Sequence, residues 1–207
     1  MRVAVIGATG TIGKHVVQAL SSKHDVIPVA RNGGEYRVDI SDPESIRRFY
    51  ANASGLDAMI CVAGSGKFAP LEKLSDEDFA YSLKDKLMGQ VNVARYGLQH
   101  INDGGSITLT SGVLAEKPMR GSAAISLVNA GIEGFARAAA LEAPRGIRVN
   151  VVSPGWVAET LQAMGQDPAN GIPASLVARA FVNSVEGNMT GMVIAAANPS
   201  YGDLKIA

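Results

Sequence analysis

A glycine-rich turn near the start of the chain constrains the fold more than any other feature. Four apolar residues, Val3–Ile6, run directly into Gly7-Ala8-Thr9-Gly10-Thr11-Ile12-Gly13, and a helical pattern follows over Thr11–Ser22. The first glycine permits a tight turn, the second lets the backbone approach a phosphate, and the third lets the helix pack against the strand. Free N–H groups at a helix N-terminus attract anions. The turn therefore predicts a strand–turn–helix unit that holds the pyrophosphate of a dinucleotide.

Short apolar runs alternate with helical stretches along the rest of the chain. Such strands are typical of a parallel sheet covered on both faces. Because crossovers between parallel strands are right-handed, we predict an α/β fold, a three-layer doubly wound parallel sheet of the Rossmann type. The length suits a single domain over 1–207, with a cofactor-binding half (1–100) and an active-site half (101–207). Further strands are expected at Asp25–Val29, Asp57–Val62, Ser106–Thr110, Ile147–Val152 and Gly191–Ala195, and helices at Pro43–Asn52, Ser75–His100, Ser122–Ala143 and Pro173–Val185.

Charge and cysteine usage exclude several classes of partner. The 19 basic and 19 acidic residues cancel, so there is no general electrostatic case for nucleic acid or for a membrane as partner. The first apolar run is too short for a signal peptide or a membrane span. The single cysteine, Cys61, excludes an internal disulfide and favours a cytoplasmic location. We expect Cys61 to be a buried small residue, the alternative being a reactive thiol at a strand end. The three histidines lack partners at ligand spacing, so no metal site is expected.

The end of the second predicted strand bears on the choice of cofactor. A carboxylate there would hold the ribose 2′-hydroxyl of NAD, but the strand ends in Val29-Ala30-Arg31-Asn32. Asp25 lies at the opposite end of the strand. An arginine without a neighbouring carboxylate suits a 2′-phosphate, to which it makes charge-assisted hydrogen bonds. We therefore expect NADP in preference to NAD; the alternative is that Arg31 is an ordinary solvated residue.

Small residues collect in the helix predicted at Ser122–Ala143, where Gly131 and Gly134 lie among several alanines. A glycine inside a helix costs about 1 kcal/mol relative to alanine. Another surface is therefore expected to approach this helix closely. Packing on the sheet is one explanation, and contact of this helix and the Ser75–His100 helix with a second subunit is the other. We expect a homodimer or a homotetramer.

Taken in order along the chain, a series of segments resembles the short-chain dehydrogenase/reductase family. The resemblance covers nearly the whole chain and implies hydride transfer between NADP and a small carbonyl compound or alcohol. Its segments are the glycine turn, Arg31, Asp39-Ile40, Ala63-Gly64, Gly104-Gly105-Ser106-Ile107, Thr110-Ser111, Gly131-Ile132-Glu133-Gly134-Phe135, Ala140-Leu141-Glu142, Arg148-Val149-Asn150, Ser153-Pro154-Gly155 and Thr190-Gly191. The cofactor-binding residues expected from the turn and the resemblance together are Gly7, Thr9, Gly10, Thr11, Ile12, Gly13, Arg31, Asn32, Asp39, Ile40, Ala63, Gly64, Pro154 and Gly155.

The resemblance implies four catalytic groups, of which this chain keeps one. In the family a tyrosine is the acid/base and a nearby lysine lowers its pKa, while a serine binds the substrate oxygen and an asparagine orders a water. Ser111 matches the serine. The tyrosine position falls on Ile125, the lysine position on Asn129 and the asparagine position on Lys86. We expect Lys86 to be a solvated or ion-paired helix residue, the alternative being that it faces the vacated site.

Three accounts of the function follow from this departure. The chain is an NADP-dependent oxidoreductase in which Ser111 binds the carbonyl and another group supplies the proton. Alternatively it is a cofactor-binding module without chemistry, such as a sensor or a partner subunit, or it binds another nucleotide on the same fold. Trp156, in the loop after Pro154-Gly155, is expected either to stack on a substrate or to fill the core of its own loop.

Overall fold

Within residues 1–196, seven strands form one parallel sheet in the order β3-β2-β1-β4-β5-β6-β7. The computed structural model describes residues 1–196; the last eleven residues of the predicted domain, 197–207, lie outside that range. From β1 the chain adds β2 and β3 on one side and β4 to β7 on the other, so the topological switch point lies between β1 and β4. Open α/β sheets bind ligands at this point, at the carboxyl ends of their strands. The strands are β1 (Arg2–Ile6), β2 (Asp25–Ala30), β3 (Tyr36–Arg37), β4 (Leu56–Cys61), β5 (Ile101–Thr110), β6 (Arg148–Pro154) and β7 (Val193–Ala196).

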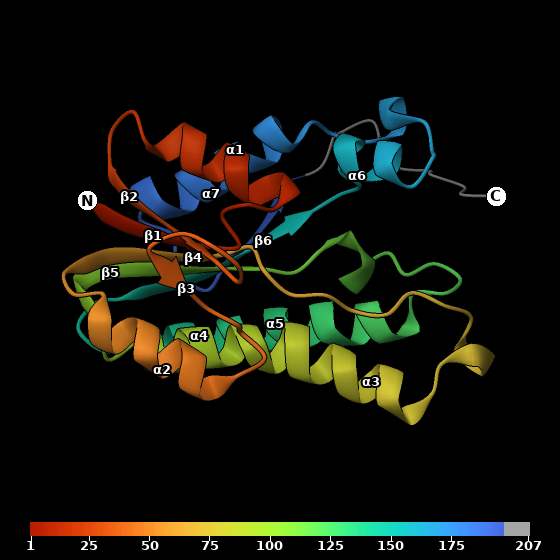
Figure 1. Cartoon of the computed structure of the whole chain (residues 1–207), viewed down its shortest axis with the longest axis horizontal. Helices are drawn as coiled ribbons and strands as arrows, with labels where there is room; N and C mark the ends of the chain where they lie inside the picture. The colour runs from red at the N-terminus through yellow and green to blue at the C-terminus, as the bar shows by residue number, and fades with distance from the viewer. Residues whose placement is uncertain (197–207) are drawn as a thin grey trace.

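Helices cover both faces of the sheet, as Figure 1 shows. One face carries α1 (Thr11–Leu20) and α7 (Ala174–Glu186), with the short α6 (Ala158–Ala163) beside them. The other face carries α2 (Pro43–Asn52), α3 (Asp76–Ser82), α4 (Gly89–Gly97) and α5 (Ala123–Glu142). The predicted three-layer doubly wound α/β fold is confirmed.

The central strand shows why apolar runs without polar alternation form this sheet. In β1, Val3 and Val5 belong to the hydrophobic core shared with α1 and α7. Ala4 and Ile6 belong to the core on the opposite face, shared with α2, α4 and α5. Both sets of side chains are buried. Every position of such a strand therefore has to be apolar.

The helix predicted over Ser75–His100 is not one regular helix. It consists of α3, a π-helical turn at Leu83–Met88, and α4. Ser75 begins α3 with a capping box, in which its side chain and that of Asp78 each accept a backbone N–H of the other residue. π-Helical turns are rare in proteins, and those that occur are often at functional sites. The prediction also missed the short strand β3 and began β5 five residues late.

A buried amide fixes the π-turn and α4 to the sheet. The side chain of Gln90 accepts the backbone N–H of Thr110 at 2.7 Å and donates to the carbonyl oxygen of the same residue at 2.8 Å. Gln90 is fully buried. Since Thr110 is the last residue of β5, this double hydrogen bond holds the first turn of α4, which directly follows the π-turn, against the carboxyl end of the strand.

Candidate functional site

The glycine turn brings α1 unusually close to β1. The N–H groups of Gly7 and Ala8 donate to the carbonyl oxygen of Val29 at 2.9 and 3.1 Å. A Cβ on Gly7 would lie 3.0 Å from the backbone of Ala63, and one on Gly13 would lie 2.0 Å from the carbonyl oxygen of Gly7. A side chain at residue 13 therefore cannot fit without moving the helix away from the strand.

The N-terminus of α1 offers donors to an anion. Its N-cap residue is Gly10, which has no side chain to accept them. Within residues 1–196, the backbone N–H groups of Thr11, Ile12 and Gly13 have no acceptor. Thr9, Gly10 and Thr11 are exposed, so a ligand can reach these groups. A helix N-terminus of this kind can bind a phosphate group, so the pyrophosphate site that the sequence predicts stays a prediction with suitable donors.

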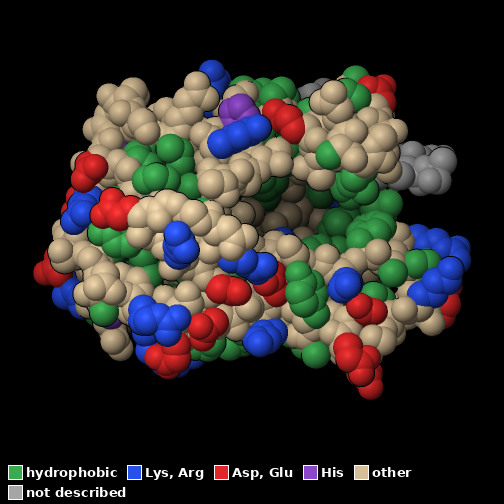
Figure 2. Space-filling view, in the orientation of Figure 1, with side chains coloured by type: hydrophobic (Ala, Val, Ile, Leu, Met, Phe, Trp, Pro, Cys, Tyr) green, Lys and Arg blue, Asp and Glu red, His purple; other side chains and the backbone are tan. Residues whose placement is uncertain are grey.

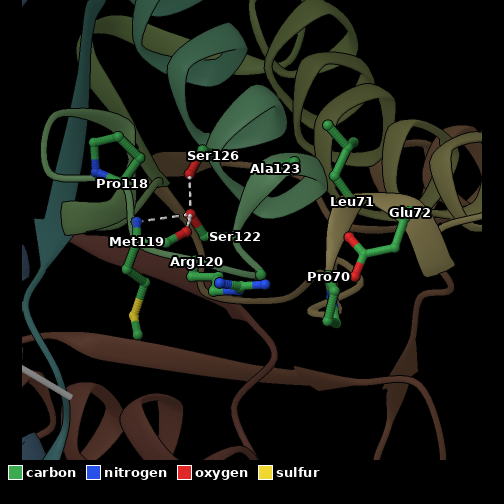
Figure 3. Close-up of a pocket in the computed structure, with 10 residues that line it drawn as sticks. Pro70, Leu71, Glu72, Pro118, Met119, Arg120, Ser122, Ala123 and Ser126 are labelled. Atoms are coloured by element: carbon green, nitrogen blue, oxygen red, sulfur yellow. Dashed lines mark hydrogen bonds between the residues drawn. The ribbon is translucent and has the colours of Figure 1, made fainter. Parts of the chain in front are cut away.

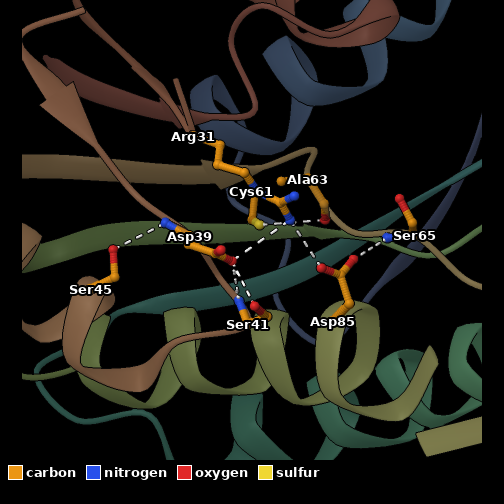
Figure 4. Close-up of polar contacts among 8 residues, drawn as sticks. All are labelled: Arg31, Asp39, Ser41, Ser45, Cys61, Ala63, Ser65 and Asp85. Atoms are coloured by element: carbon orange, nitrogen blue, oxygen red, sulfur yellow. Dashed lines mark hydrogen bonds and ion pairs between the residues drawn. The ribbon is translucent and has the colours of Figure 1, made fainter. Parts of the chain in front are cut away.

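Arg31 follows β2, and the interpretation that it lacks a neighbouring carboxylate is wrong. Its guanidinium lies 3.2 Å from the carboxylate of Asp85 and 3.7 Å from that of Asp39 (Figure 4). Asp85 is buried and also accepts the backbone N–H of Ser65 at 2.6 Å. The side chain of Arg31 nevertheless stays 58% exposed, so its remaining donors are open to a ligand. Asn32, the next residue, is exposed as well.

Asp39 and Ile40 lie beside Arg31 but face different surroundings. Burial raises the pKa of Asp39, but hydrogen bonds from Ser41 and the charge of Arg31 outweigh it and hold that pKa below its usual value. Ile40 is buried, and a Cβ on Gly89 would lie 2.9 Å from its side chain. The side chain of Ile40 thus belongs to the packing of α4 on the sheet, which leaves it no free surface for a cofactor.

A cavity of about 240 Å³ opens at the carboxyl ends of β1, β4, β5 and β6. In Figure 2 the surface is hollowed between the layer that carries α6 and the layer that carries α3. The cavity joins residues predicted separately from the glycine turn and from three further strand ends. Its lining residues are Ile12, Val62, Gly64, Lys86, Thr110, Ser111, Gly112, Val113, Leu114, Asn129, Pro154, Gly155 and Trp156.

Ser111 lies in this cavity, with its hydroxyl already engaged. The hydroxyl donates to the carboxylate of Glu133 on α5 at 2.8 Å. Glu133 is buried, and its other oxygen lies 3.6 Å from the guanidinium of Arg137. In this arrangement the oxygen of Ser111 can accept a hydrogen bond from a ligand, whereas donation to a carbonyl oxygen requires the hydroxyl to leave Glu133.

Two other residues of α5 share the face of Glu133, at spacings of four residues. Asn129 is buried; its amide nitrogen lies 3.4 Å from the carbonyl oxygen of Gly112, and its amide oxygen has no partner within residues 1–196. Ile125 is half-buried beneath the loop that follows β4, because a Cβ on Gly66 would lie 2.7 Å from its side chain. No hydroxyl is present where the resemblance expects one.

Lys86 lies in the π-turn, half-buried and without an ion pair in the part of the chain described, and it lines this cavity, which is the alternative that the sequence left open. Its ammonium donates to the carbonyl oxygen of Ser111 at 3.2 Å. Burial lowers the pKa of this ammonium from 10.5 to about 8, against a small opposing effect of Cys61. A Cβ on Gly64 would lie 3.0 Å from both the backbone and the side chain of Lys86. The glycine after β4 is therefore what allows Lys86 to enter the cavity.

The remaining strand-end groups are accounted for by the structure. Cys61 is fully buried, and burial raises the pKa of its thiol to about 12, which makes it the buried small residue that the sequence predicts. Trp156 lines the cavity, where it can contact a ligand.

Within residues 1–196, no cluster of three His, Cys, Asp or Glu side chains could hold a metal ion. None of the helices described is both long and apolar enough to span a membrane.

A second cavity, of about 420 Å³, lies at the outer end of α5 (Figure 3). Leu71 and Glu72 line one side, and Met119 and Arg120 line the other. The hydroxyl of Ser122 holds its rim by hydrogen bonds to the backbone of Met119. The two charged side chains of this cavity are exposed. Although it is the larger of the two, it contains no buried ionisable group, so we place the chemistry in the smaller cavity.

The positions of Ile125, Asn129 and Glu133 relative to one another could have been inferred from the sequence. Asn129 and Glu133 follow Ile125 at helical spacing, so all three had to share one face of α5. Glu133 was matched as part of a family motif, without a role of its own. Asp85 gave no such signal, because its partners Arg31 and Ser65 lie 54 and 20 residues away.

The model of a known protein family, described as enoyl-(acyl carrier protein) reductase, matches residues 2–195. The hydroxynaphthalene reductase arp2 of Aspergillus fumigatus is 37% identical over 103 residues, which span 49% of this chain and 38% of that protein. The 3-oxoacyl-[acyl-carrier-protein] reductase of Rattus norvegicus is 29% identical over 175 residues, 74% of each chain.

Solved structures agree over nearly the whole chain. The protein lin1944 from Listeria innocua superposes with a TM-score of 0.90 at 38% identity, covering 94% of this chain and 98% of its own. A small-chain dehydrogenase in complex with NADPH superposes with a TM-score of 0.84 at 29% identity, covering 94% and 95%.

Proposed function

Because the chain belongs to the short-chain dehydrogenase/reductase family of NAD(P)-dependent oxidoreductases, we propose that it uses NADP to transfer hydride to or from a small carbonyl compound or alcohol. One observation supports this above all. The acceptor-free amides of Thr11–Gly13 and the cavity that holds Ser111 lie side by side at the point where the strand order reverses. Such a crevice is where doubly wound sheets bind dinucleotides.

The residues present fit the cofactor. The amides at the start of α1 would hold its pyrophosphate, and Arg31 and Asp39 would border the adenosine. Pro154 and Gly155, which line the cavity, would form the wall at the nicotinamide end. When bound, the nicotinamide supplies or takes the hydride.

The preference for NADP over NAD rests on Arg31. Its guanidinium is 58% exposed and would make charge-assisted hydrogen bonds to a 2′-phosphate. Asp39 and Asp85 already contact it, and both would repel the phosphate. The preference is therefore expected to be smaller than an unpaired arginine would give. The structural relative with NADPH bound supports the same choice of cofactor.

A cofactor-binding protein without catalysis is the second candidate, and the Ser111–Glu133 hydrogen bond favours it. With its proton directed to Glu133, Ser111 does not donate to a carbonyl oxygen in this structure. Ile125 offers no proton at the position where the resemblance expects a tyrosine. For the catalytic function, Ser111 has either to release Glu133 or to accept a hydrogen bond from an alcohol substrate.

The two candidates separate in one set of measurements. The protein is titrated with NADPH and with NADH, and binding is monitored by the fluorescence of the nicotinamide and of Trp156. We expect both cofactors to bind, and NADPH to bind more tightly than NADH. Only an enzyme would then oxidise NADPH above the background rate across a panel of aldehydes, ketones and quinones. Absence of binding to either cofactor at millimolar concentration would overturn the proposal. Binding without turnover would leave the non-catalytic candidate.

We also propose that the chain forms a homodimer or homotetramer through α4 and α5. Leu127 and Leu141 on α5 are 49% and 90% exposed, and Met88, just before α4, is 41% exposed. α5 packs against α4 and against the turn that carries Met88, so a second copy that covered both helices would bury these side chains. Light scattering coupled to size-exclusion chromatography would measure the mass of the native protein and of Leu127→Glu. We expect a dimer or tetramer for the native protein and a smaller species for the variant. A native monomer at micromolar concentration would contradict the proposal.

A further inference from the structure

The cavity beside Ser111 contains one ionisable side chain among the residues that line it in the described chain. That residue is Lys86; the other lining side chains are apolar, hydroxyl or amide groups. A proton that enters or leaves a substrate held in this cavity has to be exchanged with Lys86, with a hydroxyl, or with water. Ser111 already directs its proton to Glu133.

Several independent features hold Lys86 in place. It belongs to a π-helical turn, which the Gln90–Thr110 hydrogen bonds fix to the end of β5. Gly64 has no side chain, which leaves room for the backbone and stem of Lys86. The ammonium uses one of its three donors on the carbonyl oxygen of Ser111. The other two remain for a ligand.

The charged and titratable groups around Lys86 do not neutralise it. No carboxylate lies within 4.0 Å of its ammonium in the part of the chain described. Asp85, next to it, pairs with Arg31. Glu133, on α5, accepts from Ser111 and lies near Arg137. Cys61, on β4, has its thiol pKa raised to about 12 and is uncharged near neutral pH. Lys86 is therefore a cation without a counter-ion, in a cavity that can hold a polar molecule.

We propose that Lys86 is the catalytic acid/base of this site; the inference rests on the oxidoreductase function proposed above. In the reducing direction, hydride from NADPH forms a C–H bond at the carbonyl carbon, and the π electrons of the C=O bond move to oxygen. Lys86 gives one N–H proton to that oxygen and becomes a neutral amine, which water reprotonates. The products are the alcohol and NADP⁺. The oxidising direction reverses each step.

Asn129 completes the arrangement. Its buried amide oxygen has no partner within residues 1–196, and an unpaired buried acceptor is costly. A ligand that brings a hydroxyl to this point would satisfy it, so we assign Asn129 to positioning a hydroxyl of the cofactor, the substrate or a bound water. The family that the sequence resembles has an asparagine at the position of Lys86 and a lysine at the position of Asn129. This chain therefore carries the same two side chains at exchanged positions.

The test compares Lys86→Met, Lys86→Arg and a control, Lys84→Met, which removes an exposed ammonium from the same turn. The methionine variant removes the proton, and the arginine variant keeps the charge but does not release a proton near neutral pH. Both are expected to bind NADPH within about threefold of the native affinity. Both are expected to lose at least a hundredfold in kcat on the best carbonyl substrate of the panel, since general acid catalysis contributes roughly 10²–10⁴. The control is expected to keep full activity.

A second readout does not depend on turnover. After reductive ¹³C-methylation of the lysines, the NMR signal absent from Lys86→Met identifies residue 86. That signal is expected to titrate well below the other lysines and to shift when NADP⁺ is added. Turnover retained by Lys86→Met or Lys86→Arg, or a Lys86 signal indifferent to NADP⁺, would overturn the assignment and leave the oxidoreductase function standing. Failure of the native protein to bind NADPH would overturn both.

Discussion

The lowered pKa of Lys86, a half-buried side chain, makes the stability of this protein depend on pH in a way that one substitution should remove. The pKa of this group is about 8 in the folded protein, against 10.5 in an exposed lysine. Between these values the unfolded chain binds more protons than the folded one, so stability rises with pH. The whole shift corresponds to about 3 kcal/mol, of which about 2 kcal/mol falls between pH 7 and pH 9.5.

The assay is urea unfolding of the native protein and of Lys86→Met, followed by circular dichroism at steps across this pH range. Other groups titrate there as well; the raised pKa of Cys61, for example, lowers stability above pH 9. Such effects are common to both proteins and cancel in the difference. We expect the variant to be at least as stable as the native protein at pH 7, because its side chain carries no charge to bury.

The difference between the two proteins is expected to shift by about 2 kcal/mol in favour of the native protein as the pH rises to 9.5. Curves that stay parallel within about 0.5 kcal/mol would show that the ammonium is solvated in the folded state. Lys86 would then not be a cation withdrawn from water beside Ser111, whatever the activity of the protein. If the folded protein lowered this pKa by only one unit, the effect across this pH range would be about 0.4 kcal/mol, and the curves would count as parallel.

Three further predictions concern the turn, the choice of cofactor and the thiol. Gly13→Ala would place a Cβ 2.0 Å from a carbonyl oxygen, so NADPH affinity measured by fluorescence should fall at least tenfold, whereas Gly134→Ala, with open space around it, should leave it unchanged. Asp85→Asn removes one of the two carboxylates at Arg31; isothermal titration should show NADPH binding severalfold tighter and NADH binding unchanged, and equal changes for both would contradict the 2′-phosphate assignment. Because the thiol pKa of Cys61 is raised from 9.0 to about 12, iodoacetamide at pH 8 should modify the native protein at least a hundredfold more slowly than the urea-unfolded one, as mass spectrometry would show.

The sheet was predictable because its strands carry their signal locally. A strand such as Val3–Ile6, buried on both faces, has to be a continuous apolar run. The glycine turn was predictable for a similar reason, since the short distance from Gly13 to Gly7 excludes any other residue. The two-residue strand β3 has no periodicity to detect.

The polar contacts of the site were not predictable, because they join residues far apart in the sequence. Asp85 meets Arg31 across 54 residues, and Glu133 meets Ser111 across 22. The burial of Lys86 depends on the π-turn, and the π-turn in turn on hydrogen bonds to the end of β5. A regular helical repeat over Ser75–His100 gives none of this information.

The π-turn also separates two helices that would otherwise share one rotational phase. An α-helix advances about 100° per residue, so deleting one residue from Leu83–Met88 would restore the regular repeat and rotate everything before it by that angle. Ser82, which accepts the backbone N–H of Lys67 at 2.9 Å, would then face elsewhere, while Gln90 would stay on β5. The extra residue of the π-turn thus sets the direction in which α3 faces, while the contact of α4 with β5 and the position of Lys86 between the two helices stay fixed.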